Sequence, residues 1–182
     1  MAVAETDHDK PKPQRATARR IAYGGVCASL ALLALAAIRL LPTADLALYA
    51  LTSLCVAVAV VEAGLGGGTV SWLAAAILGM LVTGAATGVP FLLLFGPYAL
   101  IKALIESGIR GAVPRILVKL LAADTLLALA ALFFIWFLNA DSHALPLPWW
   151  AIALLAQPVF LIYDTALTML ITLYVRRRHP AR

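Results

Sequence analysis

The sequence predicts an all-α membrane protein, a polytopic helix bundle of six transmembrane helices. Hydrophobic residues make up 63% of the 182 residues and charged residues only 13%, which is more apolar side chain than a soluble domain of this size can bury. The apolar residues gather in runs of about 20, the length a helix needs to cross a bilayer. Basic residues gather at the two ends and in one loop, a pattern of membrane topology and not of a nucleic-acid surface.

A basic tail of residues 1–20 precedes the first apolar run. The tail is polar, contains proline and shows no apolar periodicity, which predicts a disordered cytoplasmic segment. A basic stretch before an apolar run is also typical of a signal peptide, but this run is longer than the usual apolar core of a signal, and no convincing cleavage site follows it. We therefore expect the segment to be retained.

Six apolar runs form one transmembrane domain over residues 21–175, followed by a basic cytoplasmic tail, 176–182. The last two runs exceed the minimum length and are expected to tilt or protrude. Glycine, proline and polar residues predict the turns. The spans are expected at 21–41, 44–61, 69–86, 90–107, 114–138 and 148–175, with turns at Pro42, 64–68, 88–90, 108–114 and 141–148.

Charge placement predicts the orientation. An even number of spans puts both chain ends on one side, which then holds both basic tails and the loop with Arg110 and Arg115. Of the 14 Lys and Arg residues, only Arg39 falls near the opposite face. Since cytoplasmic loops carry the excess of Lys and Arg, we expect a multi-pass protein of the cell (inner) membrane with cytoplasmic N- and C-termini. Five spans would place the basic tails on opposite sides and break this rule.

No catalytic, cofactor or metal site is predicted, and we do not expect an enzyme. Cys27 and Cys55 fall inside predicted spans, where a thiol is most often a packing residue. The three histidines are scattered, and no motif for zinc, for a nucleophile with its base or for a phosphate-binding loop is present. The stretch GLGGG, residues 64–68, follows a membrane span and not a strand, so it predicts a cytoplasmic turn and not a dinucleotide site.

Charged residues inside the predicted spans are the most informative feature. An ionised side chain in lipid is costly, so it generally faces the protein interior and has a partner. Lys102 and Glu106 are four residues apart on one helix face, while Asp124 and Asp164 lie at matching depth on two spans. We expect an interhelical network that pairs Lys102 or Lys119 with Asp124 or Asp164. These five residues are the candidates for substrate binding or coupling.

An interfacial position is the alternative for part of this set. The long Lys, Arg and Glu stems between residues 102 and 119 can snorkel to the cytoplasmic surface, which makes this segment a helical hairpin partly outside the lipid. Asp124 and Asp164 have side chains too short to reach water from mid-span, so a buried polar site, structural or functional, is expected there. Glu62, which closes the second span, is a further candidate for the network.

Small residues at helical spacing predict close helix packing in the first span. Gly24, Ala28 and Ala31 form a candidate docking face, either within this chain or against a partner. In the fourth span, Gly96 and Pro97 predict a kink.

The polar stretch 139–148 and the paired Trp149 and Trp150 are expected on the outer side. Tryptophan pairs of this kind anchor chains at the membrane interface. With Arg39 and Asp45, this region can also form the mouth of a ligand site.

Together these features resemble the substrate-binding S component of energy-coupling factor transporters: six spans, basic cytoplasmic ends, a first span rich in small residues and a middle helix broken by Gly and Pro. The stretch FGPYALIKALIE, residues 95–106, is similar to a motif of uncharacterised small bacterial membrane proteins with this plan. The resemblance implies capture of a vitamin or metal ion from outside, then docking on a transmembrane coupling subunit and ATPases. The chain departs from the family because Gly24 and Cys27 replace docking alanines, and because its charged residues lie in the inner half of the bilayer.

Three functions remain open. A solute-binding subunit for small-molecule or vitamin uptake predicts an outer pocket among the spans and a docking face on the first helix. A non-transporting membrane scaffold or assembly protein predicts an interaction surface on the tails and on loop 110–119 instead. An intramembrane proton-coupled carrier or enzyme predicts that Asn at Asp124 or Asp164 abolishes activity in a folded protein. In all three the partner is the lipid bilayer, and no nucleic acid is expected.

Overall fold

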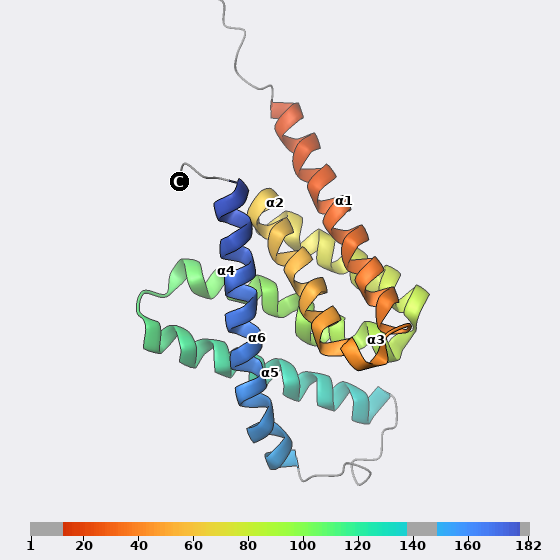
Figure 1. Cartoon of the computed structure of the whole chain (residues 1–182), viewed down its shortest axis with the longest axis vertical. Helices are drawn as coiled ribbons and strands as arrows, with labels where there is room; N and C mark the ends of the chain where they lie inside the picture. Colours follow the sequence, from red (N-terminus) through yellow and green to blue (C-terminus); the bar gives the residue numbers. More distant parts are fainter. Residues whose placement is uncertain (1–12, 138–148, 179–182) are drawn as a thin grey trace, which may run out of the picture.

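A computed structural model describes residues 13–137 and 149–178 of the protein (Figure 1). Every regular element in these residues is helical, so the all-α class is confirmed. Five of the helices are long and apolar enough to cross a membrane. Large apolar side chains cover their outer surfaces, with Leu81 78% and Trp136 84% exposed, and such a surface is stable in lipid and not in water. The chain is therefore a multi-pass membrane protein.

The first helix, α1 (Pro13–Ile38), begins before the expected start of the first span. Residues 13–20, predicted as part of a disordered tail, are the first turns of this helix, and residues 1–12 lie outside the described part. Pro13 presets the φ angle at the first helical position, where its missing N–H is not needed. The Gln, Arg and Ala residues after it are good helix formers, which the polar character of the tail concealed.

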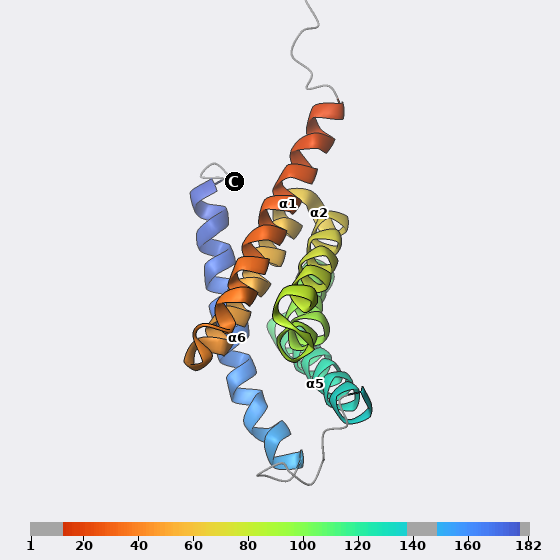
Figure 2. The same ribbon diagram turned by 90° about the vertical axis from the view of Figure 1, so that its right-hand side faces the viewer.

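The second helix, α2 (Asp45–Thr83), contains the predicted second and third spans in one broken helix. The break lies at Gly64, whose φ of 79° and ψ of 177° are unfavourable for a residue with a Cβ. The chain reverses there, so the two arms of α2 form a V (Figures 1 and 2). Gly68 lets the arms meet closely, because a Cβ would lie 2.3 Å from Val60 Cγ2. The expected turn 64–68 is therefore a break at its first residue followed by helix, and six separate helices are not confirmed.

A second break separates α2 from the predicted fourth span. Gly84 has φ 83° and ψ 169°, and the chain becomes helical again as α3 (Ala85–Pro90). The turn expected at 88–90 is wrong, because these residues are helical and the turn is made by the glycine before them. Gly88 is used for close packing instead, since a Cβ there would lie 2.6 Å from Met80 Cγ.

A π-helical turn, η2 (Phe91–Phe95), joins α3 to α4 (Gly96–Gly108). The kink predicted at Gly96 and Pro97 lies at this junction. Pro97 has no N–H to donate to the preceding turn, and a widened turn is one way in which a helix accommodates that loss. The lack of a Cβ at Gly96 admits the Trp72 ring, whose Cδ1 is 2.0 Å from the position a Cβ would take.

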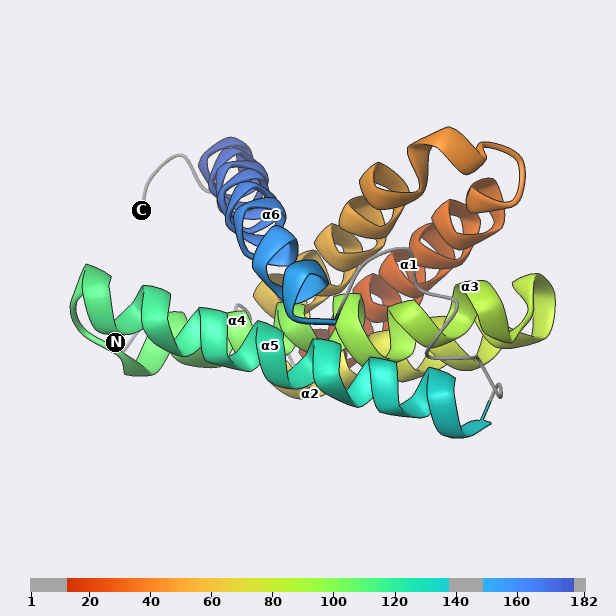
Figure 3. The ribbon, with the colours of Figure 1, turned by 90° about the horizontal axis from the view of Figure 1, so that it is seen from below.

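The last two helices are α5 (Ala112–Phe137) and α6 (Trp149–Arg178). α6 extends into the predicted tail 176–182, of which the last four residues lie outside the described part. α4 and α5 lie side by side and cross α6 (Figures 1 and 3). The start of α1 and the end of α6 lie at the same end of the molecule (Figures 1 and 2).

Two clusters of buried residues hold these helices together. The larger lies between α1, α2, η2 and α4, with Ala31, Leu35, Val56 and Phe91 at or below 1% exposure. The smaller is built on Tyr98, Tyr163 and Leu167, and it joins α4 to α6. The candidate functional site lies at this smaller cluster.

Candidate functional site

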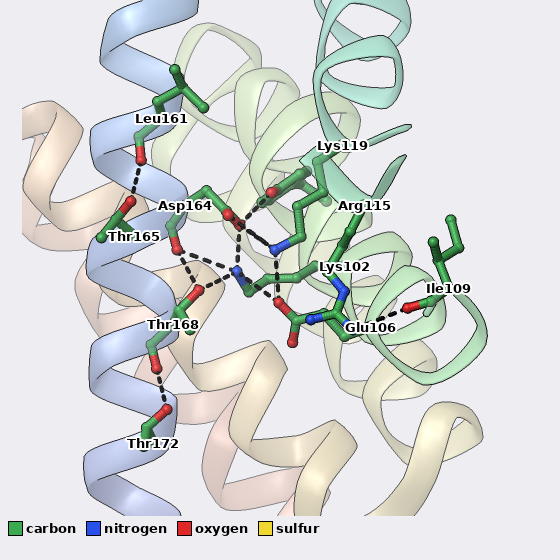
Figure 4. Close-up of polar contacts among 11 residues, drawn as sticks. Lys102, Glu106, Ile109, Arg115, Lys119, Leu161, Asp164, Thr165, Thr168 and Thr172 are labelled. Atoms are coloured by element: carbon green, nitrogen blue, oxygen red, sulfur yellow. Dashed lines mark hydrogen bonds and ion pairs between the residues drawn. The ribbon is translucent and has the colours of Figure 1, made fainter. Parts of the chain in front are cut away.

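Lys102 on α4 is the centre of the candidate site. Its side chain is only 2% exposed, and an unpaired ammonium at such a position is costly. Nζ is surrounded by acceptors: the carboxylate of Asp164 and its carbonyl at 3.2 Å, Thr168 Oγ1 at 2.7 Å and Glu106 Oε1 at 3.3 Å (Figure 4). Asp164 and Thr168 are four residues apart on α6, so one face of that helix presents both to Lys102.

Lys119 on α5 adds the second cation. Its Nζ lies 2.7 Å from Glu106 Oε1 and 3.0 Å from Asp164 Oδ2, and its side chain is 8% exposed. Tyr98 on α4 donates its O–H to Asp164 Oδ1 at 2.5 Å. The single carboxylate of Asp164 therefore accepts from two lysines and one tyrosine.

The ionic network of Lys102, Glu106, Lys119 and Asp164 joins α4, α5 and α6 and has no net charge. Ions removed from water are tolerated when every one is paired, and removal of one partner leaves a buried charge uncompensated. The network is therefore suited to fixing the three helices relative to one another. A proton or a charged ligand can enter it only by replacing an existing ion pair.

The structure thus brings together four of the five predicted site residues. Lys102 and Lys119 do not snorkel, because their side chains are buried at 2% and 8% exposure and both pair with Asp164. Glu106 lies at the edge of the network with 36% exposure. Arg115 has a separate place, with its guanidinium 3.0 Å from the Ile109 carbonyl oxygen.

Asp124 is the predicted site residue outside this network. It follows Lys119 by five residues on α5, which turns the two side chains to different neighbours. Gln157 Nε2 on α6 donates to both carboxylate oxygens of Asp124, at 2.8 and 2.9 Å. No cationic side chain forms an ion pair with Asp124 within residues 13–137 and 149–178. Of the two acids expected as partners for the lysines, Asp164 takes both. Asp124 is exposed, so the buried polar site expected at this residue is wrong.

Glu62 also lies elsewhere. It accepts the O–H of Tyr174 at 2.8 Å and lies 3.6 Å from Arg178 Nε, while Arg178 also contacts Tyr23. These contacts fasten the end of α6 to α1 and to the bend of α2, away from Lys102. The prediction that Glu62 joins the ionic network is therefore wrong.

A pocket of about 220 Å³ adjoins the network. Four aromatic rings line it: Phe95 and Tyr98, three residues apart, and Phe160 and Tyr163, also three apart on α6. The rings meet edge to face, with centroids 4.9 Å apart for Tyr98 and Phe160 and 5.7 Å for Phe95 and Tyr163. The other lining residues are Leu46, Leu94, Ala123, Asp124, Leu126, Leu127, Ala156, Gln157 and Val159.

Tyr98 connects the pocket to the network, because its ring lines the pocket and its O–H binds Asp164. Sequence reasoning missed this residue and the aromatic pocket. The available signal was the i,i+3 spacing of Phe95 with Tyr98 and of Phe160 with Tyr163, which puts each pair on one helix face. Which two faces meet depends on helix packing, and local spacing does not reveal it.

The candidate docking face on α1 is used within the chain. Ala28 and Ala31 are buried at 9% and 0% exposure, and the Gly24 carbonyl accepts the Ser71 hydroxyl from α2 at 2.9 Å. A partner helix that needs this face has to displace α2.

Two further predictions concern metal binding and the outer stretch. Within residues 13–137 and 149–178, no group of three or more His, Cys, Asp or Glu residues could hold a metal ion. The outer stretch 139–148 lies outside the described residues, and of the anchor pair the structure shows that α6 begins at Trp149. Comparisons of the chain with protein-family models, with curated proteins and with solved structures found no significant match.

Proposed function

We propose that the protein is a solute-binding subunit of a membrane transporter, of a build like that of an S component, and that it binds a small molecule between α2, α4, α5 and α6. The observation that carries the proposal is the aromatic pocket of about 220 Å³. Ligand sites are typically concave, mostly apolar and equipped with a few polar groups that fix orientation. Asp124 and Gln157 supply such groups here.

The proposed topology has six crossings and cytoplasmic termini, with the two arms of α2 as separate crossings. In that topology α5 runs outward and α6 runs inward. Asp124 then lies further out than Lys119, and Gln157 further out than Asp164. The pocket is thus on the outer side of the network, where a subunit that captures solute from outside needs it.

Through Tyr98, a change in the pocket can affect how the helices are held together. A solute that moves the Tyr98 ring disturbs its hydrogen bond to Asp164, and Asp164 is paired to both α4 and α5. Docking on a coupling subunit and ATPases is the second half of the proposal and rests on the resemblance alone. Because α2 covers Ala28 and Ala31, we expect docking to use a different surface of the chain.

Native mass spectrometry of the protein, extracted in lipid particles from its own membrane, tests the proposal. A bound small molecule, or ATPase subunits at a fixed ratio, supports it. A pocket-filling variant, Ala123→Phe, should lose the small molecule, whereas Ala131→Phe, at an exposed position of the same helix, should keep it. An empty protein accompanied by a partner that is not an ATPase would favour the scaffold instead.

A proton-coupled carrier is the second candidate, and one observation favours it. A surface groove on α6 extends from Asp164 past Thr168 and Thr172 to the basic end at Arg176, with threonine side chains in a mainly apolar lining. It gives Asp164 a route past these threonines to one end of the molecule. For this function, Asp164→Asn must abolish proton-driven uptake into vesicles while the variant still elutes as a folded protein.

A further inference from the structure

Asp124 is a negatively charged residue of the pocket lining, and its hydrogen-bond partner, Gln157, is neutral. Both of its oxygens accept from a single amide nitrogen, that of Gln157, so each oxygen retains capacity for a further donor. A carboxylate at membrane depth is costly unless a cation accompanies it. Asp124 is exposed and is among the residues that line the pocket, so a molecule bound there can reach its carboxylate and supply the missing positive charge.

The two nearest buried cations are already in use. Lys102 and Lys119 are paired with Asp164 and Glu106 in the ionic network. No Lys, Arg or His lines the pocket within the described residues. Among the described residues, the pocket therefore has one carboxylate without a cationic partner and no cationic side chain that could pair with an anion.

The aromatic lining suits the same kind of ligand. The negative face of an aromatic ring attracts cations within about 6 Å, and aromatic cages recognise ammonium groups in this way. One face of Phe95 is covered by Tyr49, whose ring is stacked on it at 4.6 Å. Tyr98 and Phe160 pack edge to face with centroids 4.9 Å apart, so the planes of these two lining rings are nearly perpendicular.

We propose that the pocket is selective for an organic cation: a small molecule with an apolar or aromatic body and an ammonium group, the ammonium held by Asp124 and the body by the rings. This inference rests on the proposed solute-binding function and specifies the substrate class of that site. Gln157 acts as a positioning residue, because it holds the carboxylate at the pocket wall.

Three simple probes with equal numbers of heavy atoms separate the effect of charge from that of size: cationic 4-phenylbutylammonium, neutral N-benzylacetamide and anionic 3-phenylpropionate. Each is titrated by calorimetry into the full chain in nanodiscs of zwitterionic lipid, with empty nanodiscs as the blank. We expect the cation to bind at least about tenfold more tightly than either other probe.

Variants then assign the preference to the pocket. Asp124→Asn should bring binding of the cation to the level of the neutral probe. Phe160→Leu keeps an apolar side chain but removes a ring. It should weaken binding of the cation more than binding of the neutral probe. Glu62→Gln is the matched control, a carboxylate removed beside the break of α2 and outside the pocket lining, and it should change none of the three affinities. Elution profiles check that each variant is folded.

Distinct results overturn this inference and the proposed function. Equal or tighter binding of the neutral or anionic probe to the wild type, or a cation preference that persists in Asp124→Asn, overturns the cation class and leaves a solute-binding pocket. Binding of none of the probes also overturns it for ligands of this size. The solute-binding function fails separately, if native mass spectrometry finds neither a small molecule that Ala123→Phe displaces nor ATPase subunits at a fixed ratio.

Discussion

Asp164 on α6 and Lys102 on α4, 62 residues apart in the chain, form an ion pair between the two helices (Figure 4). The same carboxylate lies 3.0 Å from Lys119 Nζ on α5, so one acid joins α4, α5 and α6. Stability at this junction depends on charge balance. Substitutions that change the balance should therefore have larger effects than substitutions that preserve it.

Removal of one charge is the first test. Lys102→Met leaves two carboxylates with one lysine, and we expect a loss of about 3 kcal/mol or more of unfolding free energy. The double variant Lys102→Met with Asp164→Leu retains the neutral Lys119–Glu106 pair and should be more stable than Lys102→Met alone. Thermal unfolding in one detergent compares them. A double variant whose losses simply add would show that charge balance is unimportant here.

Two threonines of α6 provide a matched pair. Thr168 Oγ1 lies 2.7 Å from Lys102 Nζ, whereas Thr165 Oγ1 donates to the Leu161 carbonyl of its own helix. Thr168→Val should cost about 1 kcal/mol because a buried ammonium loses an acceptor, and Thr165→Val should change stability by less. Chemical denaturation of both variants in the same micelles gives the comparison. Equal effects would mean that the bond to Lys102 contributes nothing.

The bend of α2 gives a backbone prediction. Gly64 has φ 79°, so Gly64→Ala should destabilise the protein by about 1–3 kcal/mol through backbone strain. Gly66 is helical and a Cβ there meets nothing within 4 Å, so Gly66→Ala should be neutral or stabilising. Melting temperatures of the two variants decide the matter, and a harmless Gly64→Ala would contradict the break at this residue.

The proposed six crossings predict which residues are accessible from each side. With Cys27 and Cys55 replaced by Ala, a cysteine at exposed Thr43 should react with an impermeant maleimide in intact cells. A cysteine at exposed Gly66, beside the bend, should react only after the membrane is opened. If both react from the same side, the arms of α2 do not cross the membrane separately.

Local sequence predicted much of this architecture. Apolar runs of membrane length predicted the helices, and the need to pair a charge in lipid predicted that Lys102, Lys119 and Asp164 would find partners on other helices. The breaks were less predictable. Gly64 and Gly84 make the turns while 88–90 remains helical, because a positive φ is a property of the folded backbone and several glycines nearby were equally able to adopt it.

By itself the sequence determined that this protein is helical, lies in a membrane and contains charges that require partners, because length, hydropathy and charge are local properties of the chain. Only the tertiary structure decided that Asp164 pairs with both lysines and that Asp124 binds Gln157 instead. It also decided that α2 covers the small-residue face of α1 and that four aromatic rings line one pocket. The physical reason is that each of these outcomes depends on how helices are rotated and crossed. Contacts between residues far apart in the chain fix that arrangement, and the spacing along any one helix does not.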